Sequence, residues 1–206
     1  MWLVYRTAIL RQLEMKKEST MSETLAKIKN LLGLGDIHIP KLQPQTTYLF
    51  GGVTFPDLVK TLKALGFSFH AETKRLLCLN GFEAFPLRSG VVSFPFKDFS
   101  SDFQVLCNKN AGQQKNTLNS WGTEMCSGEE FLFFLLHMVL LHGKNEAVKC
   151  LTVAGVSPAM IRCRNKDEKT SLAVQLSPPY PDEIRFATLR DARRDPSIGA
   201  CRIRRL

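Results

Sequence analysis

Nearly every position from Phe131 to Leu141 is apolar, and this pattern predicts a helix that is buried on most of its sides. Glu129 and Glu130 come directly before the run, where the positive end of a helix dipole favours acidic side chains. The run is too short to cross a bilayer, which takes about 20 residues. We therefore expect the central helix of a folded core here, and no membrane span.

A second, shorter helix is predicted to follow after a tight turn. Gly143 can adopt the positive φ that ends a helix, and an apolar stripe recurs beyond it at helical spacing. The stripe consists of Ala147, Val148, Leu151 and Ala154. Gly155 supplies the next stop, and Pro158 prevents any continuation of the helix. The pattern therefore predicts two short antiparallel helices joined at Gly143.

The chain before this helix pair mixes helical and strand patterns. Residues 48–50 favour a short strand, and residues 56–65 favour a helix with a proline in its first turn. The Asn-Gly pair at 80–81 is typical of a hairpin turn, and the apolar residues from 91 to 96 favour a further strand. We interpret 46–107 as a mixed α and β segment.

The remaining segments complete the predicted organisation. Residues 1–45 are predicted to form N-terminal helices and a linker, and residues 108–127, rich in Asn, Gln, Lys and Gly, are predicted to be a second linker. Residues 128–176 contain the helical part. Residues 177–206 form a Pro-rich hinge and a basic tail, in which 181–194 favour one more helix. The expected fold class is α+β, with a helical C-terminal part.

The stretch from Leu136 to Pro158 reads LHMVLLHGKNEAVKCLTVAGVSP. Its Leu136-His137 pair and the helix pattern of Glu146–Leu151 fall where an ankyrin repeat has them. The region of about 131–158 therefore resembles one degenerate ankyrin repeat, and 165–172 resembles the turn and the start of a second. This resemblance implies an ankyrin-like helix-turn-helix whose turns bind a protein partner and which carries no catalytic group.

The chain carries a formal net charge of +9, but the charge is unevenly distributed. Residues 185–206 contain seven arginines against two aspartates, a net charge of +5, so the preceding 184 residues share only +4. The basic character is therefore mainly a property of the last 22 residues. This uneven distribution weakens the expectation that the rest of the protein binds nucleic acid.

The residue types that usually carry catalysis or bind metals are scattered along the chain. The six cysteines, at 78, 107, 126, 150, 163 and 201, form no Cys-x-x-Cys pair, and with the four histidines they make no zinc-binding spacing. We interpret the cysteines as reduced thiols and His137 as an internal hydrogen-bonding residue. Asp98 and Asp102 are interpreted as helix caps or solvated charges. No metal, cofactor or catalytic residue is predicted.

The expected location is intracellular, in the cytoplasm or the nucleus. The cysteines do not form the dense framework of a small secreted domain, and Arg6 interrupts the apolar core that a signal peptide needs. A mitochondrial presequence is the alternative interpretation of residues 1–13, which contain no acidic residue.

The sequence thus favours an intracellular protein-protein interaction module without catalytic activity. The expected partner-binding residues share one polar turn and are Arg162, Arg164, Asn165, Lys166, Asp167 and Glu168. The alternative is a nucleic-acid-associated protein that acts through arginines of its C-terminal tail, namely Arg190, Arg193, Arg194, Arg202, Arg204 and Arg205. An enzyme whose site assembles from scattered residues is the third hypothesis.

Overall fold

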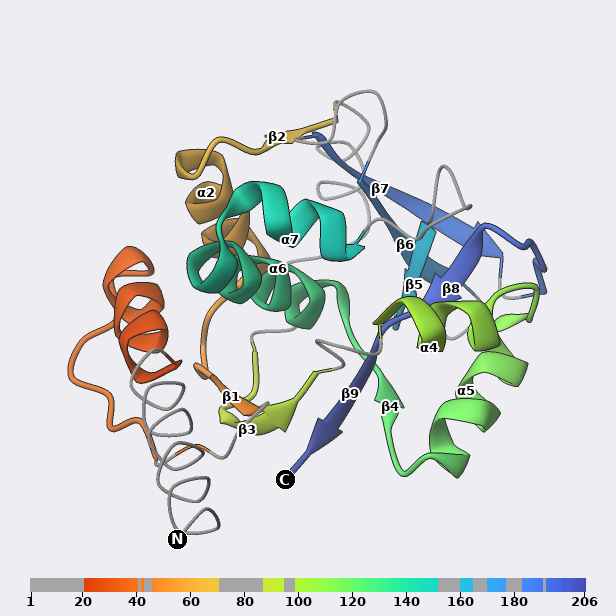
Figure 1. Ribbon diagram of the computed structural model, residues 1–206, viewed down its shortest axis with the longest axis horizontal. Helices are drawn as coiled ribbons and strands as arrows, with labels where there is room; N and C mark the ends of the chain where they lie inside the picture. The colour runs from red at the N-terminus through yellow and green to blue at the C-terminus, as the bar shows by residue number, and fades with distance from the viewer. Residues whose placement is uncertain are drawn as a thin grey trace, which may run out of the picture.

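The computed structural model describes residues 21–40, 42, 46–70, 87–94, 99–151, 160–164, 170–176, 183–190 and 192–206, without the side chains of 150, 151, 170, 171 and 176. Within these residues lie six helices and two sheets, and they confirm an α+β fold (Figure 1). The helices are 21–31, α2 (Phe55–Ala64), α4 (Phe99–Leu106), α5 (Ala111–Ser120), α6 (Gly128–His142) and α7 (Lys144–Leu151). The strands are β1 (Thr46–Leu49), β2 (Ser68–Phe69), β3 (Gly90–Ser93), β4 (Glu124–Met125), β5 (Met160–Cys163), β6 (Thr170–Leu176), β7 (Glu183–Arg190), β8 (Ile198–Ala200) and β9 (Arg202–Arg205).

The first sheet has four antiparallel strands in the order β1-β3-β9-β4. Its β1 and β3 confirm the strands expected around 48–50 and 91–96, and they are joined with Thr46 opposite Ser93. The last strand of the chain, β9, lies between β3 and β4. The C-terminal residues are therefore built into the interior of this sheet.

The second sheet has five strands in the order β2-β7-β6-β5-β8. Strands β5, β6 and β7 pair antiparallel, while β2 and β8 lie parallel to their neighbours at the two edges. Because β8 ends at Ala200 and β9 begins at Arg202, the chain passes directly from the second sheet to the first at Cys201. This crossing brings the two sheets together at one point.

Helix α6 lies in the centre of the molecule, with α2 on one side and the second sheet on the other (Figure 1). Its residues from Gly128 to Val139 are all buried, as the apolar run predicts. Phe134 stacks on Phe94 of the chain after β3, with ring centroids 4.8 Å apart, and this contact joins the helix to the first sheet. In the part of the chain that the structure describes, no helix is long and apolar enough to span a membrane.

The predicted pair of helices around Gly143 is confirmed as far as residue 151. Gly143 has a φ of 84°, the left-handed value that favours glycine, and α7 begins at the next residue. Ala147 of the expected apolar stripe is buried against the core. The stripe's last member, Ala154, and the predicted stops at Gly155 and Pro158 lie outside the described residues.

The expected helical C-terminal part is wrong beyond α7. Residues 160–163 and 170–176 are the antiparallel strands β5 and β6, so no second ankyrin-like helix begins at 170–172. The helix expected over 181–194 is also wrong, because residues 183–190 form β7. From Glu183 to Phe186, partly buried and fully buried side chains alternate with the two-residue period of a strand, and the alternation breaks before Leu189.

The segment expected as a linker, 108–127, contains a helix. Asn110 caps α5, since its side-chain oxygen accepts a hydrogen bond from the backbone N–H of Gln113 at 2.9 Å, and the side-chain oxygen of Gln113 accepts one from the backbone N–H of Asn110. Gln114 is fully buried and donates to the carbonyl oxygens of Leu106 and Ile198. This polar helix is therefore attached to the second sheet by hydrogen bonds as well as by apolar contacts.

Two glycines allow helices to approach the second sheet closely. A Cβ atom at Gly128 would lie 2.7 Å from Cδ2 of Leu172, and a Cβ atom at Gly199 would lie 2.3 Å from the ring of Phe103. The N-terminus of α6 therefore rests directly on β6, and α4 rests directly on β8. A larger residue at Gly199 would push α4 away from the sheet, whereas one at Gly128 would require the end of the Leu172 side chain to move.

His137 on α6 is an internal hydrogen-bonding residue, as the sequence predicts. It is fully buried, and its Nδ1 lies 3.0 Å from Oγ1 of Thr47 on β1. Burial, assisted by the nearby His142, lowers the pKa of His137 from 6.5 to about 4. The imidazole is therefore neutral at physiological pH and becomes charged only at a cost to the fold.

We expect acid to destabilise the protein through His137. Its folded-state pKa of about 4 lies below the value of 6.5 for an exposed imidazole, so in this window the unfolded chain binds a proton that the folded chain does not. The stability that depends on a neutral His137 is fully present above pH 6.5 and is lost as the pH falls. At pH 4 this loss lowers the free energy of unfolding by about 3 kcal/mol. Urea unfolding at pH 7 and pH 4 measures this loss.

The matched variant is His137→Gln, which keeps a polar side chain but cannot titrate. Its free energy of unfolding should fall less between pH 7 and pH 4 than that of the original protein. The two losses should differ by about 3 kcal/mol. This comparison removes the opposing effect of Glu129, whose pKa is raised by burial. Equal acid sensitivity of the two proteins would show that His137 is not the group responsible.

Candidate functional site

Three cysteines meet where the chain crosses between the two sheets. Cys126 follows β4, Cys163 ends β5, and Cys201 lies between β8 and β9. The backbone N–H of Cys126 donates to the carbonyl oxygen of Cys201 at 3.0 Å, and the carbonyl oxygen of Cys126 accepts from the N–H of Arg164 at 2.8 Å. All three side chains are fully buried. Main-chain hydrogen bonds therefore hold these three positions together.

The thiols of Cys126 and Cys163 face one another, with their Sγ atoms 4.0 Å apart. Burial acts to raise the pKa of Cys126, but hydrogen bonds from the side chains of Cys163 and Cys201 outweigh it and lower that pKa below its ordinary value. The pKa values of Cys163 and Cys201 are correspondingly raised, by burial and by their contacts with Cys126. Of the three thiols, Cys126 is thus the one that its surroundings favour as a thiolate.

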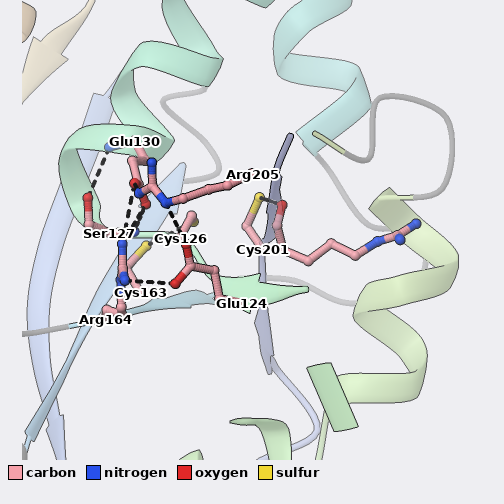
Figure 2. Close-up of polar contacts among 9 residues, drawn as sticks. Glu124, Cys126, Ser127, Glu130, Cys163, Arg164, Cys201 and Arg205 are labelled. Atoms are coloured by element: carbon pink, nitrogen blue, oxygen red, sulfur yellow. Dashed lines mark hydrogen bonds and ion pairs between the residues drawn. The ribbon is translucent and has the colours of Figure 1, made fainter. Parts of the chain in front are cut away.

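A ring of four charged side chains lies beside the thiols (Figure 2). The guanidinium of Arg164 donates to Oε2 of Glu124 at 3.0 Å and to Oε2 of Glu130 at 3.1 Å. Arg205 donates from Nε to Oε1 of Glu124 at 2.8 Å and from its terminal nitrogen to Oε1 of Glu130. Positive and negative groups therefore alternate around a closed ring whose formal charges sum to zero.

Glu130 is the most buried member of the ring. Its side chain is 4% exposed, against 36–42% for the other three. The same carboxylate accepts a hydrogen bond from the backbone N–H of Ser127 at 2.7 Å, and the Ser127 hydroxyl accepts one from the N–H of Glu130. This reciprocal capping box begins α6. Glu130 therefore joins the start of the central helix to the guanidinium group of Arg164, which follows β5, and to that of Arg205 on β9.

An open hollow of about 400 Å³ adjoins the ring. It lies between the end of α5 and strands β4 and β9, and its lining residues are Asn119, Gly122, Thr123, Glu124, Ile203, Arg204 and Arg205. Arg204 is exposed and donates to the carbonyl oxygen of Trp121 at 2.8 Å. A carbonyl group does not neutralise a guanidinium, so Arg204 gives this hollow an excess positive charge.

Of the residues expected to bind a protein partner, the structure describes Arg162 and Arg164. Arg162 is fully buried on β5, where it donates to Oε1 of Gln114 and to the carbonyl oxygen of Arg193. Its burial excludes direct contact with a partner and corrects its expected position. Arg164 is a member of the charged ring. Asn165, Lys166, Asp167 and Glu168 lie outside the described residues.

The arginines expected in a basic tail divide into two groups. Those of β9 are built into the fold: Arg202 pairs with Asp102 at 2.5 Å, Arg204 binds the Trp121 carbonyl, and Arg205 belongs to the charged ring. The interpretation of Asp102 as a cap or a solvated charge is therefore corrected. The second group, Arg190, Arg193 and Arg194, is exposed at the end of β7 and in the turn before β8.

Sequence reasoning missed the cluster of thiols and charges because its members are far apart along the chain. Cys126 and Cys163 are 37 positions apart, and Glu130 and Arg205 are 75 apart. A local signal did exist, since Ser127 followed by Glu130 has capping-box spacing. Among the described residues, no group of three or more His, Cys, Asp or Glu side chains is arranged to hold a metal ion.

We expect replacement of Glu130 by Gln to destabilise the fold. The amide keeps the size of the side chain but removes the charge that faces Arg164 and Arg205. Loss of one partner from a buried ionic network, discounted for the partial exposure of the arginines, should reduce the free energy of unfolding by about 2 kcal/mol. Chemical denaturation measures the change.

The control is Glu146→Gln, which removes the exposed pair with Lys149 and should have little effect. Equal effects of the two substitutions would contradict a special role for Glu130.

Comparison with known proteins gives this arrangement no counterpart: no family model, no curated protein and no solved structure matches the chain.

Proposed function

We propose that this chain is a non-catalytic binding protein whose hollow beside β9 receives an acidic segment of a partner protein. The observation that carries the proposal is the position of Arg204 in that hollow. Its guanidinium is exposed, and among the described residues it donates a hydrogen bond to a backbone carbonyl oxygen and to no carboxylate. A carboxylate from another protein would supply the charge-assisted hydrogen bonds that this group can still make.

The neighbouring Arg205 favours binding because its orientation is already fixed. Glu124 and Glu130 hold its guanidinium from two sides, so little side-chain entropy would be lost when a partner binds. Asn119 and Thr123 add neutral polar groups to the lining. Arginines held in place within a hollow have the character of interface residues that contribute strongly to binding.

Helices α6 and α7 would act as a scaffold in this proposal. The side chains of α6 are buried among the core elements from its first residue to Val139, so they offer little area to a partner. The contact surface is therefore assigned to the α5, β4 and β9 side of the molecule. The polar turn expected from the resemblance is not needed.

A random peptide library displayed on phage tests this proposal. Peptides selected on the immobilised full-length protein should be enriched in Asp and Glu. Arg204→Glu should reduce the affinity of a selected peptide at least tenfold, since a favourable charge becomes a repulsive one. Fluorescence anisotropy of the labelled peptide gives the dissociation constant.

The control for that experiment is Arg194→Glu, which makes the same charge change at an exposed position away from the hollow. Peptide affinity should stay within about twofold of the original protein, because only the overall charge is altered. Equal weakening by both variants would indicate attraction to net charge alone and would contradict binding in the hollow.

A second candidate function, association with nucleic acid, is favoured by the exposed group of Arg190, Arg193 and Arg194. The backbone that carries them is fixed by a hydrogen bond from the N–H of Arg193 to the carbonyl oxygen of Arg190. Asp195 offsets part of the charge, because it pairs with Arg193 at 3.1 Å. Arginines that are close together in a fixed turn can contact successive phosphates.

Binding to a single-stranded RNA 20-mer at several salt concentrations tests this second candidate. Simultaneous replacement of Arg190, Arg193 and Arg194 by Gln should weaken binding and reduce the slope of log K against log salt by about 2. The control removes three exposed lysines elsewhere, at Lys27, Lys60 and Lys63, and should leave most of the affinity. Equal losses in the two triple variants would exclude a defined site on the turn.

A further inference from the structure

We propose that Cys126 and Cys163 are an oxidation site, at which hydrogen peroxide converts two buried thiols into a disulfide that joins the two sheets. This inference concerns covalent modification and does not depend on the binding function proposed above. It rests on the geometry of the thiols, on the strand pairing that holds them and on the charged ring beside them.

The backbone already holds the two cysteines at positions that a disulfide can bridge. Ser127 forms a parallel bridge with Arg164, and the N–H of Arg164 donates to the carbonyl oxygen of Cys126 at 2.8 Å. Cys126 and Cys163 are the residues immediately before the two members of this isolated bridge. Neighbouring strands are about 4.8 Å apart, within the range of Cα separations that disulfides span. With the Sγ atoms 4.0 Å apart, bond formation needs side-chain rotation and little movement of the backbone.

The surroundings distinguish the attacking thiol from the resolving one. Burial and the negative charge of Glu130 oppose a thiolate at Cys126, but hydrogen bonds from Cys163 and Cys201, assisted by the positive charge of Arg164, outweigh them and favour it. The thiolate is the form of cysteine that reacts with peroxide. Cys163 retains its proton and lies next to the sulfur that would be oxidised.

The oxidation balances in two steps. The sulfur of Cys126 attacks one peroxide oxygen, the O–O bond breaks, and one water leaves as Cys126 becomes a sulfenic acid. The sulfur of Cys163 then attacks the oxidised sulfur, the S–S bond forms, the S–O bond breaks, and a second water leaves. In total the two thiols lose two electrons and two protons, and one peroxide is reduced to two waters.

The charged ring controls access to these thiols. Cys126 and Cys163 are fully buried, whereas the Glu124, Arg164 and Arg205 side chains beside them are partly exposed. Figure 2 shows the ring side chains gathered around Cys126 and Cys163. Transient opening of these ion pairs would admit a small oxidant. Oxidation should therefore be slower than that of an exposed thiol, and it should depend on the stability of the ring.

The disulfide would fasten parts of the fold that now meet only through non-covalent contacts. It would join the segment between β4 and α6 to the end of β5, closing a loop that contains α6 and α7. A cross-link of this length restricts the unfolded chain, so the oxidised protein should melt at least about 5 °C higher than the reduced protein.

The experiment treats the folded full-length protein with hydrogen peroxide, blocks the remaining thiols in denaturant and analyses the digested peptides by mass spectrometry. We expect linked peptides containing Cys126 and Cys163, lighter by two hydrogens than the separate pair, and their loss on reduction with dithiothreitol. The melting temperature should rise together with the linked fraction. A disulfide between any other pair of cysteines, or oxidation of Cys107 while Cys126 and Cys163 remain alkylatable, would overturn the proposal.

Two variants separate the roles of the thiols. Cys163→Ser should abolish the linkage and leave a sulfenic acid at Cys126 that dimedone traps. Cys107→Ser, which removes a partly exposed thiol outside the cluster, should leave the linkage unchanged. If Cys163→Ser does not fold, the peptides of the original protein still decide the question. Dimedone labelling at Cys163 and not at Cys126 would reverse the assigned roles and contradict the mechanism.

Discussion

The fold depends on the interactions of one carboxylate, that of Glu130. It accepts hydrogen bonds from the start of its own helix at Ser127 and from the guanidinium groups of Arg164 and Arg205. These partners belong to α6, to the residue after β5 and to β9. A buried charge of this kind is tolerated only while its partners are present, because an isolated carboxylate loses far more hydration than the interior returns. The position of α6 is thereby coupled to the pairing of both sheets.

The crossing of the chain at Cys201 makes this coupling necessary. Strands β8 and β9 are consecutive but belong to different sheets, and β4 reaches the second sheet through Ser127 and Arg164. Small side chains are required where three such segments approach, and the buried cysteines at 126, 163 and 201 meet this requirement. The sulfur cluster and the charged ring are therefore two layers of the same junction, one apolar and inside, the other ionic and partly exposed.

Local patterns predicted the elements that are stabilised locally. The apolar run of α6, the glycine after it and the helix that became α2 are all determined by residues within a few positions of one another. The α5 helix was missed because its apolar content is low, although the Asn110 and Gln113 capping pair was present in the sequence. Strands β8 and β9 were missed because their partners lie far along the chain, which no local window contains, whereas β5, β6 and β7 were missed although they pair with their neighbours in sequence. The ankyrin resemblance favoured helices in the same region and reinforced this error.

The candidate site could not be predicted for the same reason, and its charges show why composition was a poor guide. Seven arginines among the last 22 residues suggested a solvated basic tail. The structure instead pairs Arg202 with Asp102 and Arg205 with Glu124 and Glu130, so much of that charge serves to close the first sheet. Among the arginines of this C-terminal segment, those that are exposed and lie outside the charged ring are Arg190, Arg193, Arg194 and Arg204. Both surfaces exist only because the C-terminal strands are folded, and any binding that uses them depends on the integrity of the junction at Glu130.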